Sequence, residues 1–185
     1  MATNQANAPA PADPGLPVSC ECGYIQFRTP SSKPAGMAHC HCTNCQKQSA
    51  SAFGTSLYFP AAQVFPLPAA LEAKLSVFTH PTDSGNTMHC YFCPRCGVRM
   101  LHACILPDGS RRDKVSFKAG TVDAGCLDWK GMKAKHIFTR SAVIELLPEW
   151  ECYETYPPAP APPVGAAVGG EEGKKKEAVE KEEGV

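Results

Sequence analysis

Cysteine is the residue that most constrains how this chain can fold, because 11 of its 185 residues are cysteines and seven of these stand in three short groups. The densest group, Cys40-His41-Cys42-Thr43-Asn44-Cys45, holds three thiols within six residues. The other two groups are the pair Cys20 and Cys22 and the pair Cys93 and Cys96. Thiols at such short spacings point either to disulfides or to metal ions.

The start of the chain favours metal over disulfides. Residues 1–17 contain neither the basic segment nor the apolar segment of a secretion signal, and no later run approaches the about 18 apolar residues of a membrane span. We therefore expect an intracellular, cytoplasmic protein, in which reducing conditions disfavour disulfides. An odd number of cysteines also leaves at least one thiol over. Metal binding is the better explanation for the clustered thiols.

Length and charge limit the remaining possibilities. A chain of 185 residues with 43% hydrophobic residues fits one globular domain. Lys plus Arg and Asp plus Glu both number 18, so no net field points to nucleic acid, to an anionic membrane surface or to a strongly acidic substrate. We expect no nucleic-acid or membrane partner.

The local patterns predict a mainly β domain between two disordered tails. Residues 1–15 lack periodicity, and residues 156–185 are rich first in Pro, Ala and Gly and then in Glu and Lys. Two short helices are expected, one after a cap at Thr43 and one at 141–147. Strands are predicted at 16–27, 37–42, 52–59, 75–79, 87–92, 98–106 and 114–119, with a hairpin turn at 83–86.

The three-cysteine group predicts an open metal site. Side chains alternate along an extended segment, so Cys40 and Cys42 share one face and His39 and His41 take the other. Cys45 then returns through a turn. Three sulfurs without a fourth protein donor nearby are typical of a zinc site that keeps one position for water or substrate. We expect both histidines to pack beside the site rather than to bind the metal.

The sequence Cys93-Pro94-Arg95-Cys96-Gly97 is that of a zinc knuckle, in which a tight turn brings two thiolates together. A tetrahedral site needs two more ligands, which Cys20 and Cys22 can supply. The spacing alone also permits the opposite pairing, in which Cys40 and Cys42 join the knuckle. The remaining cysteines are expected to pack as small apolar residues; they are Cys90, Cys104, Cys126 and Cys152.

Several motifs follow one another in the order of a known family. They are Cys20-x-Cys22-Gly23-Tyr24, Cys40-His41-Cys42-x-x-Cys45-x-Lys47, Ala52-Phe53-Gly54-Thr55, Tyr91-Phe92-Cys93-Pro94-x-Cys96-Gly97, Ala119-Gly120-Thr121-Val122-Asp123 and His136-Ile137-Phe138. Over residues 16–151 the chain resembles the glutathione-dependent formaldehyde-activating (GFA) family, which includes the centromere protein V-like proteins. It has Gln46, Ala50 and Val98 where that family usually has Arg, Gly and Ser.

The resemblance implies a single zinc-containing β-tent domain over residues 16–151. It also implies two zinc ions with different roles. Cys20, Cys22, Cys93 and Cys96 would hold a structural zinc, and Cys40, Cys42 and Cys45 would hold a catalytic zinc. Glutathione would be the substrate or co-substrate.

The charge of the open site indicates which reaction it suits. Zinc with three thiolates carries a net charge of minus one, so it activates carbonyls poorly but suits the binding and exchange of a fourth thiolate. We therefore expect a carbon–sulfur lyase acting on a glutathione adduct or a related thioether, with Lys47 as a substrate-binding residue. The alternative is a non-catalytic zinc module that binds a protein or chromatin partner.

Overall fold

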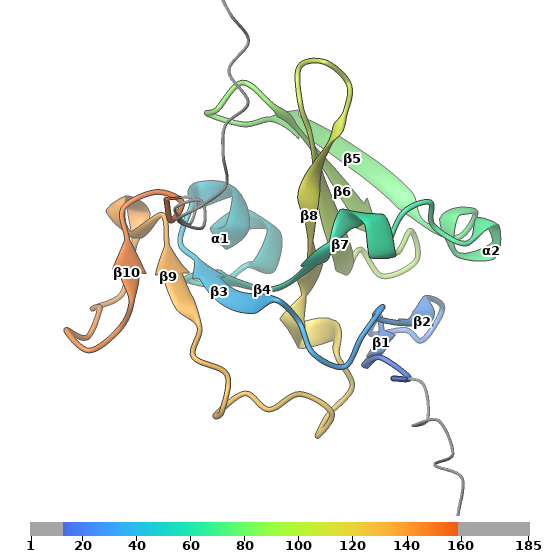
Figure 1. Cartoon of the computed structure of the whole chain (residues 1–185), viewed down its shortest axis with the longest axis horizontal. Coiled ribbons are helices and arrows are strands. Elements are labelled where there is room, and N and C mark those ends of the chain that lie inside the picture. Colours follow the sequence, from blue (N-terminus) through green and yellow to red (C-terminus); the bar gives the residue numbers. More distant parts are fainter. Residues whose placement is uncertain (1–12, 159–185) are drawn as a thin grey trace, which may run out of the picture.

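The computed structural model describes residues 13–158, so most of the two segments predicted as disordered tails lie outside the described residues. Two sheets make up the described part, a β1–β2 hairpin and a larger sheet with strand order β10-β9-β3-β4-β8-β7-β6-β5 (Figure 1). All neighbours in the larger sheet are antiparallel except β9, which runs parallel to both β3 and β10. The chain is mainly β, as the sequence predicts.

The elements are short and follow one another closely. The strands are β1 Pro17–Ser19, β2 Gln26–Arg28, β3 Gly36–Cys40, β4 Gly54–Pro60, β5 Ser76–Pro81, β6 Thr87–Phe92, β7 Arg99–Ile105, β8 Arg111–Lys118, β9 Lys135–Ile137 and β10 Cys152–Tyr153. The α-helices are α1 Thr43–Ser49 and α2 Ala69–Glu72, and single 3-10 turns are η1 Ala61–Gln63, η2 Ala119–Thr121 and η3 Thr139–Ser141. None of the helices in residues 13–158 has both the length and the apolar character that a membrane crossing requires.

The core lies on one face of the larger sheet. The pairing of β4 with β8 sets Leu57 opposite Phe117 and Phe59 opposite Val115, and all four side chains are almost fully buried. The rings of Phe59 and Phe117 meet edge to face with centroids 5.1 Å apart. Burying each of these side chains stabilises the fold by about 1.5–3 kcal/mol. Cys20 and Cys93 are part of this core, whereas Cys40 lies in a second, small cluster with Ala38 and Ile137.

The β1–β2 hairpin covers the same core and corrects one prediction. Val18 and Ile25 are buried in that core. The sequence predicted one strand over residues 16–27, but the chain there forms parts of two strands, β1 and β2. The chain reverses at Gly23, whose φ of +71° is costly for other residues, and the Gly23 N–H donates to the Cys20 carbonyl at 2.9 Å. A tight turn, not the alternation of a strand, therefore brings Cys20 and Cys22 together.

Two helix predictions need correction as well. Helix α1 forms, but its N-cap is Cys42 and not Thr43: the Cys42 sulfur accepts a hydrogen bond from the backbone N–H of Cys45 at 3.4 Å. The helix predicted at 141–147 is absent from the described chain, where only η3 reaches Ser141. Val143 is 67% exposed, so a helix there would have no apolar face to bury.

Candidate metal centres

Four sulfur atoms come together between the β1–β2 turn and the β6–β7 turn. The sulfurs of Cys20, Cys22, Cys93 and Cys96 all lie within 4.8 Å of one another. The Cys20–Cys22 separation is 3.6 Å and the Cys22–Cys93 separation is 3.8 Å. Metal–sulfur bonds of about 2.3 Å in a tetrahedron set the sulfurs about 3.8 Å apart. The donor set therefore fits a tetrahedral metal ion, and the structure brings Cys20 and Cys22, rather than Cys40 and Cys42, to the knuckle.

Backbone N–H groups favour thiolates in this group. The Gly97 N–H closes the second turn by donating to the Cys93 carbonyl at 2.8 Å, and φ of Gly97 is +75°. The Ile25 N–H donates to the Cys20 sulfur at 3.2 Å. A hydrogen bond from the Val98 N–H is the largest cause that lowers the pKa of Cys96, to about 6.

A cation–π contact fastens the two turns together. The guanidinium carbon of Arg95, between the knuckle cysteines, lies 3.5 Å from the ring centroid of Tyr24, which follows the first pair. The four-cysteine group thus joins segments about 70 residues apart through a second contact besides its sulfurs.

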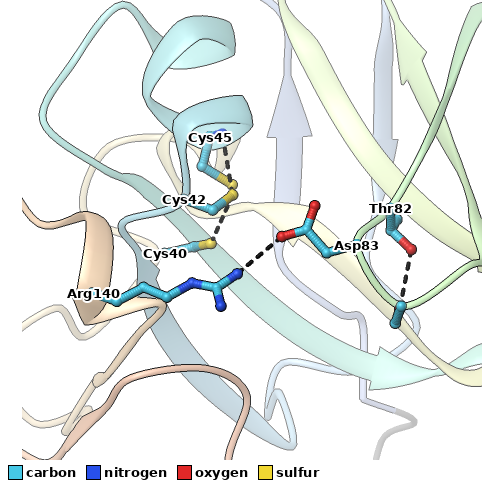
Figure 2. A network of polar contacts seen from close by, with 7 residues as sticks. Cys40, Cys42, Cys45, Thr82, Asp83 and Arg140 are labelled. Carbon is cyan, nitrogen blue, oxygen red and sulfur yellow. Dashed lines mark hydrogen bonds and ion pairs between the residues drawn. The ribbon is translucent and has the colours of Figure 1, made fainter.

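The second group forms where β3 ends and α1 begins. The sulfurs of Cys40, Cys42 and Cys45 lie within 4.8 Å of one another, with 3.4 Å between Cys40 and Cys42 (Figure 2). No fourth histidine, cysteine or carboxylate joins the group in the part of the chain that the structure describes. The arrangement can hold a metal ion with one coordination position left for another ligand.

The protonation of these three thiols is strongly linked. Hydrogen bonds from the Cys40 and Cys45 thiols lower the pKa of Cys42 to about 2, and the Cys42 contact raises the pKa of Cys40. One anion in the group thus suppresses the ionisation of its neighbour, as expected for charges that share one space. A cation at the centre would remove this repulsion, so the chemistry of the donor set also fits a metal ion.

A layer of aromatic rings supports β3 on the side away from the sulfurs. The Nε2 atom of His41 lies 3.0 Å from Nδ1 of His136, and the His136 ring stacks on Trp150 with centroids 4.3 Å apart. His39 packs against Phe53 and places Nδ1 2.9 Å from the Thr55 hydroxyl. His39 and His41 therefore pack behind the cysteines, as the sequence predicts.

Two glutamines of α1 connect the three-cysteine group to its surroundings. The Gln46 amide donates to the carbonyls of His41 and Ser141 at 2.7 and 2.8 Å, which fixes η3 beside the helix. The Gln48 amide donates to the Cys45 sulfur at 3.1 Å. Sequence reasoning missed both contacts, because a glutamine in a short helix gives no signal of its partner.

A cavity of about 450 Å³ is lined by Cys96 of the four-cysteine group and by residues next to the three-cysteine group, although Cys40, Cys42 and Cys45 do not line it themselves. Gln48 and Gly54 line it on the side of the three-cysteine group, where a Cβ added at Gly54 would lie 3.7 Å from the Cys45 sulfur. Cys96 lines it on the other side, and Arg99 and Lys118 supply positive charge. Sequence reasoning missed these two cations, although they stand next to the knuckle and to Ala119-Gly120-Thr121.

The remaining predicted residues are placed as follows. Lys47 is exposed and does not line the cavity. Ser49, two residues further along α1, does line it, because residues two apart on a helix point to different sides. Its role in substrate binding stays a prediction. All the cysteines are free; Cys90 and Cys104 are buried as predicted, but Cys126 and Cys152 are exposed. Cys126 stands in a surface loop and Cys152 on the short edge strand β10, so neither has a core to enter.

Comparison with known proteins agrees with this geometry. No curated protein matches the chain. A family model described as "Glutathione-dependent formaldehyde-activating enzyme" matches residues 16–141, which is more than half of the chain and includes both cysteine groups. By sequence the chain is therefore a member of the GFA family.

Proposed function

We propose that the protein is a zinc-dependent carbon–sulfur lyase that makes or breaks a C–S bond in a glutathione adduct or a related thioether. The observation that carries this proposal is the three-sulfur group without a fourth donor among the described residues, next to a cavity. We also propose zinc at both groups, structural at the four-cysteine group and catalytic at the three-cysteine group. Family membership supports a glutathione-type substrate.

Zinc, when bound by Cys40, Cys42 and Cys45, would supply a position that holds the substrate sulfur as a thiolate. Cys42 is the thiol of the group that most readily loses its proton. The pKa of Cys45 is raised overall: the contact with Cys40 lowers it, the Cys42 contact and burial raise it by more, and the nearby Lys118 charge offsets part of that rise. The positive charge of Lys118 offsets part of the negative charge of the thiolates, which favours the binding of an anionic sulfur ligand.

The proposed cleavage balances as follows for a hemithioacetal adduct. The C–S bond breaks, its electron pair leaves with sulfur as a thiolate, the adjacent hydroxyl gives its proton to solvent water, and the carbon departs as an aldehyde. In the opposite direction, the thiolate adds to the aldehyde and the oxygen gains a proton. We assign no separate acid or base, because the cysteine group itself meets the main requirement, a stabilised leaving thiolate.

A screen of glutathione conjugates tests the proposal. The zinc-loaded protein is incubated with S-hydroxymethyl and S-alkyl conjugates, and the appearance of free thiol is measured against the Cys42→Ala variant. We expect thiol release that needs Cys42 in at least one conjugate. Glutathione should also raise the melting temperature of the native protein.

The non-catalytic alternative predicts a different result. A zinc module that only binds a macromolecular partner would release no thiol from any conjugate and would gain no thermal protection from glutathione. This joint outcome would overturn the lyase proposal.

A further inference from the structure

Two residues that line the cavity beside the three-cysteine group carry buried polar atoms without partners. Among the buried side-chain atoms of the described residues, Oε1 of Gln48 and Nη1 of Arg99 have no hydrogen-bond partner, and both residues line this cavity. A buried donor or acceptor without a partner destabilises the folded protein. A ligand with one acceptor and one N–H donor would satisfy both atoms.

Two basic side chains of the cavity are candidate partners for an anion. Arg99 and Lys118 line it, and no acidic side chain of the described residues does. Both cations also act on the neighbouring His102: burial is the main cause that lowers the pKa of this histidine, and the charges of Lys118 and Arg99 lower it further. Arg99 and Lys118 therefore give an anionic group two cationic partners inside the cavity.

The Arg99 guanidinium is held in place before any ligand arrives. Its central carbon lies 5.0 Å from the ring centroid of Phe78 and 5.5 Å from that of Phe92. The Lys118 ammonium lies 3.5 Å from the Ser56 hydroxyl, at the limit of a hydrogen bond. A carboxylate would be a stronger partner for both cations than any they now have.

Gln48 connects this cavity to the three-cysteine group. Its Nε2 donates to the Cys45 sulfur at 3.1 Å, while Oε1 of the same amide is unpaired. A ligand N–H that met Oε1 would thus lie one amide group away from the sulfurs. The volume of about 450 Å³ is in the usual range for small-molecule sites.

We propose that this cavity selects the substrate by binding its carboxylate through Lys118 and Arg99 and its N–H group through Gln48, while the substrate sulfur lies at the three-cysteine group. The substrate class is then a thiol, or its adduct, that carries a carboxylate and an amide or amine. This inference rests on the proposed function and adds the residues that determine specificity.

Calorimetric titration of the zinc-loaded full-length protein tests the inference. The probes are S-methylglutathione and its diethyl ester, which differ only in their carboxylates and have no thiol to ionise. Lys118→Met and Arg99→Met should each weaken S-methylglutathione binding by at least about tenfold, which is the loss of one charged hydrogen bond. The ester should bind the native protein as weakly as the acid binds these variants.

Matched variants separate charge from structure. Lys118→Arg should retain most of the affinity, and Lys114→Met should retain all of it, because Lys114 is an exposed residue of the same strand that does not line the cavity. The ring of Trp129 lines the cavity and is 47% exposed, so binding should change its fluorescence. The signal should vanish in Trp129→Phe, which leaves Trp150 as the other tryptophan.

The outcomes distinguish this inference from the lyase proposal. Binding that depends on Lys118 without any thiol release would contradict the lyase and leave the cavity assignment standing. The assignment would be overturned if acid and ester bound equally, if both charge-removing variants kept full affinity, or if the native protein bound neither probe at millimolar concentration.

Discussion

Arg140 and Asp83 form an ion pair 2.9 Å long that joins η3 to the β5–β6 turn, segments 57 residues apart (Figure 2). Their side chains are 51% and 87% exposed. Water and salt screen such a pair, and the ordering of two long side chains opposes it. The ion pair therefore shows that η3 and the β5–β6 turn lie side by side, but it contributes little to the free energy of unfolding.

We therefore predict that Asp83→Asn lowers the free energy of unfolding by less than about 1 kcal/mol. Urea unfolding at low and high salt measures the change, and the difference between native and variant should shrink as salt rises. A loss of several kcal/mol, or one insensitive to salt, would show that the pair is more enclosed than its exposure indicates.

The sequence was informative where a residue's chemistry is fixed by short spacing. The knuckle Cys93-Pro94-Arg95-Cys96 and the group from Cys40 to Cys45 could be recognised because each is closed by a local turn. The pairing of Cys20 and Cys22 with the knuckle depends on how β1–β2 packs on the core, which the spacing does not encode. The ligand count offered this pairing as one of two, and the resemblance to a family selected it.

The residues that line the cavity could not be predicted from the sequence either, because they come together only when distant strands pair. Arg99 and Lys118 come from β7 and β8, and their neighbourhood arises from the order of strands in the sheet. Cys42 as the N-cap of α1 was missed because a thiol is not a usual capping group. Its sulfur takes this role here because the chain must turn at Cys42 to bring Cys45 back.

A second prediction concerns pH. His102 is buried on β7, and burial, followed by the charges of Lys118 and Arg99, holds its pKa well below 6.5 in the folded protein. Between its folded pKa and 6.5 the unfolded chain binds the extra proton, so stability is complete above 6.5 and falls as pH decreases. The slope from this one group is at most about 1.4 kcal/mol per pH unit.

His102→Gln should therefore reduce the loss of stability between pH 7 and about pH 5. Denaturant unfolding at each pH compares it with the native protein and with His89→Gln, a half-buried histidine on the neighbouring strand β6. Acid release of metal affects all three proteins, so the difference between them isolates His102. Identical pH profiles for His102→Gln and the native protein would contradict this assignment.

The limits of the domain give a third prediction. The sequence sets the tails at 1–15 and 156–185, yet the Asp13 carboxylate accepts a hydrogen bond from the Ser32 N–H at 2.9 Å, and the Tyr156 ring meets Tyr58. Arg28 also donates to the Gly15 carbonyl at 2.9 Å. We propose that the folding unit extends a few residues beyond the predicted 16–151.

A chain of residues 13–158 should melt within about 1 °C of the full-length protein, whereas residues 16–155 should melt about 2–4 °C lower, the shift expected for a loss of about 1 kcal/mol. Calorimetry on the zinc-loaded proteins measures both. Equal melting of the two shortened chains would restore the limits predicted from sequence.

Metal removal provides a fourth prediction. If zinc fills both groups, the purified protein should contain about two ions per chain. A mild chelator should remove one ion first, from Cys40, Cys42 and Cys45, because that group has an exchangeable position. Elemental analysis over time should show two steps, and loss of both ions in a single step would contradict the two-site proposal.

The final prediction separates folding from activity by changing one cysteine in each group. Cys96→Ala removes a ligand of the group that ties the β1–β2 turn to the β6–β7 turn, so the folding energy of that metal ion is lost. We expect this variant to be insoluble or to lack a cooperative unfolding transition. Cys42→Ala removes a ligand just after β3, outside the main core and at the edge of the small cluster of Ala38, Cys40 and Ile137.

Cys42→Ala should keep its fold and about one zinc ion while losing thiol release and glutathione protection. Because Cys42 also caps α1, a loss of about 1 kcal/mol is expected from the missing cap, and Cys42→Ser, which restores a capping oxygen, should recover most of it without restoring activity. Zinc content, circular dichroism and melting temperature are compared for all three variants. If Cys42→Ala unfolds the chain as severely as Cys96→Ala, the three-cysteine group is structural and the lyase proposal loses its main support.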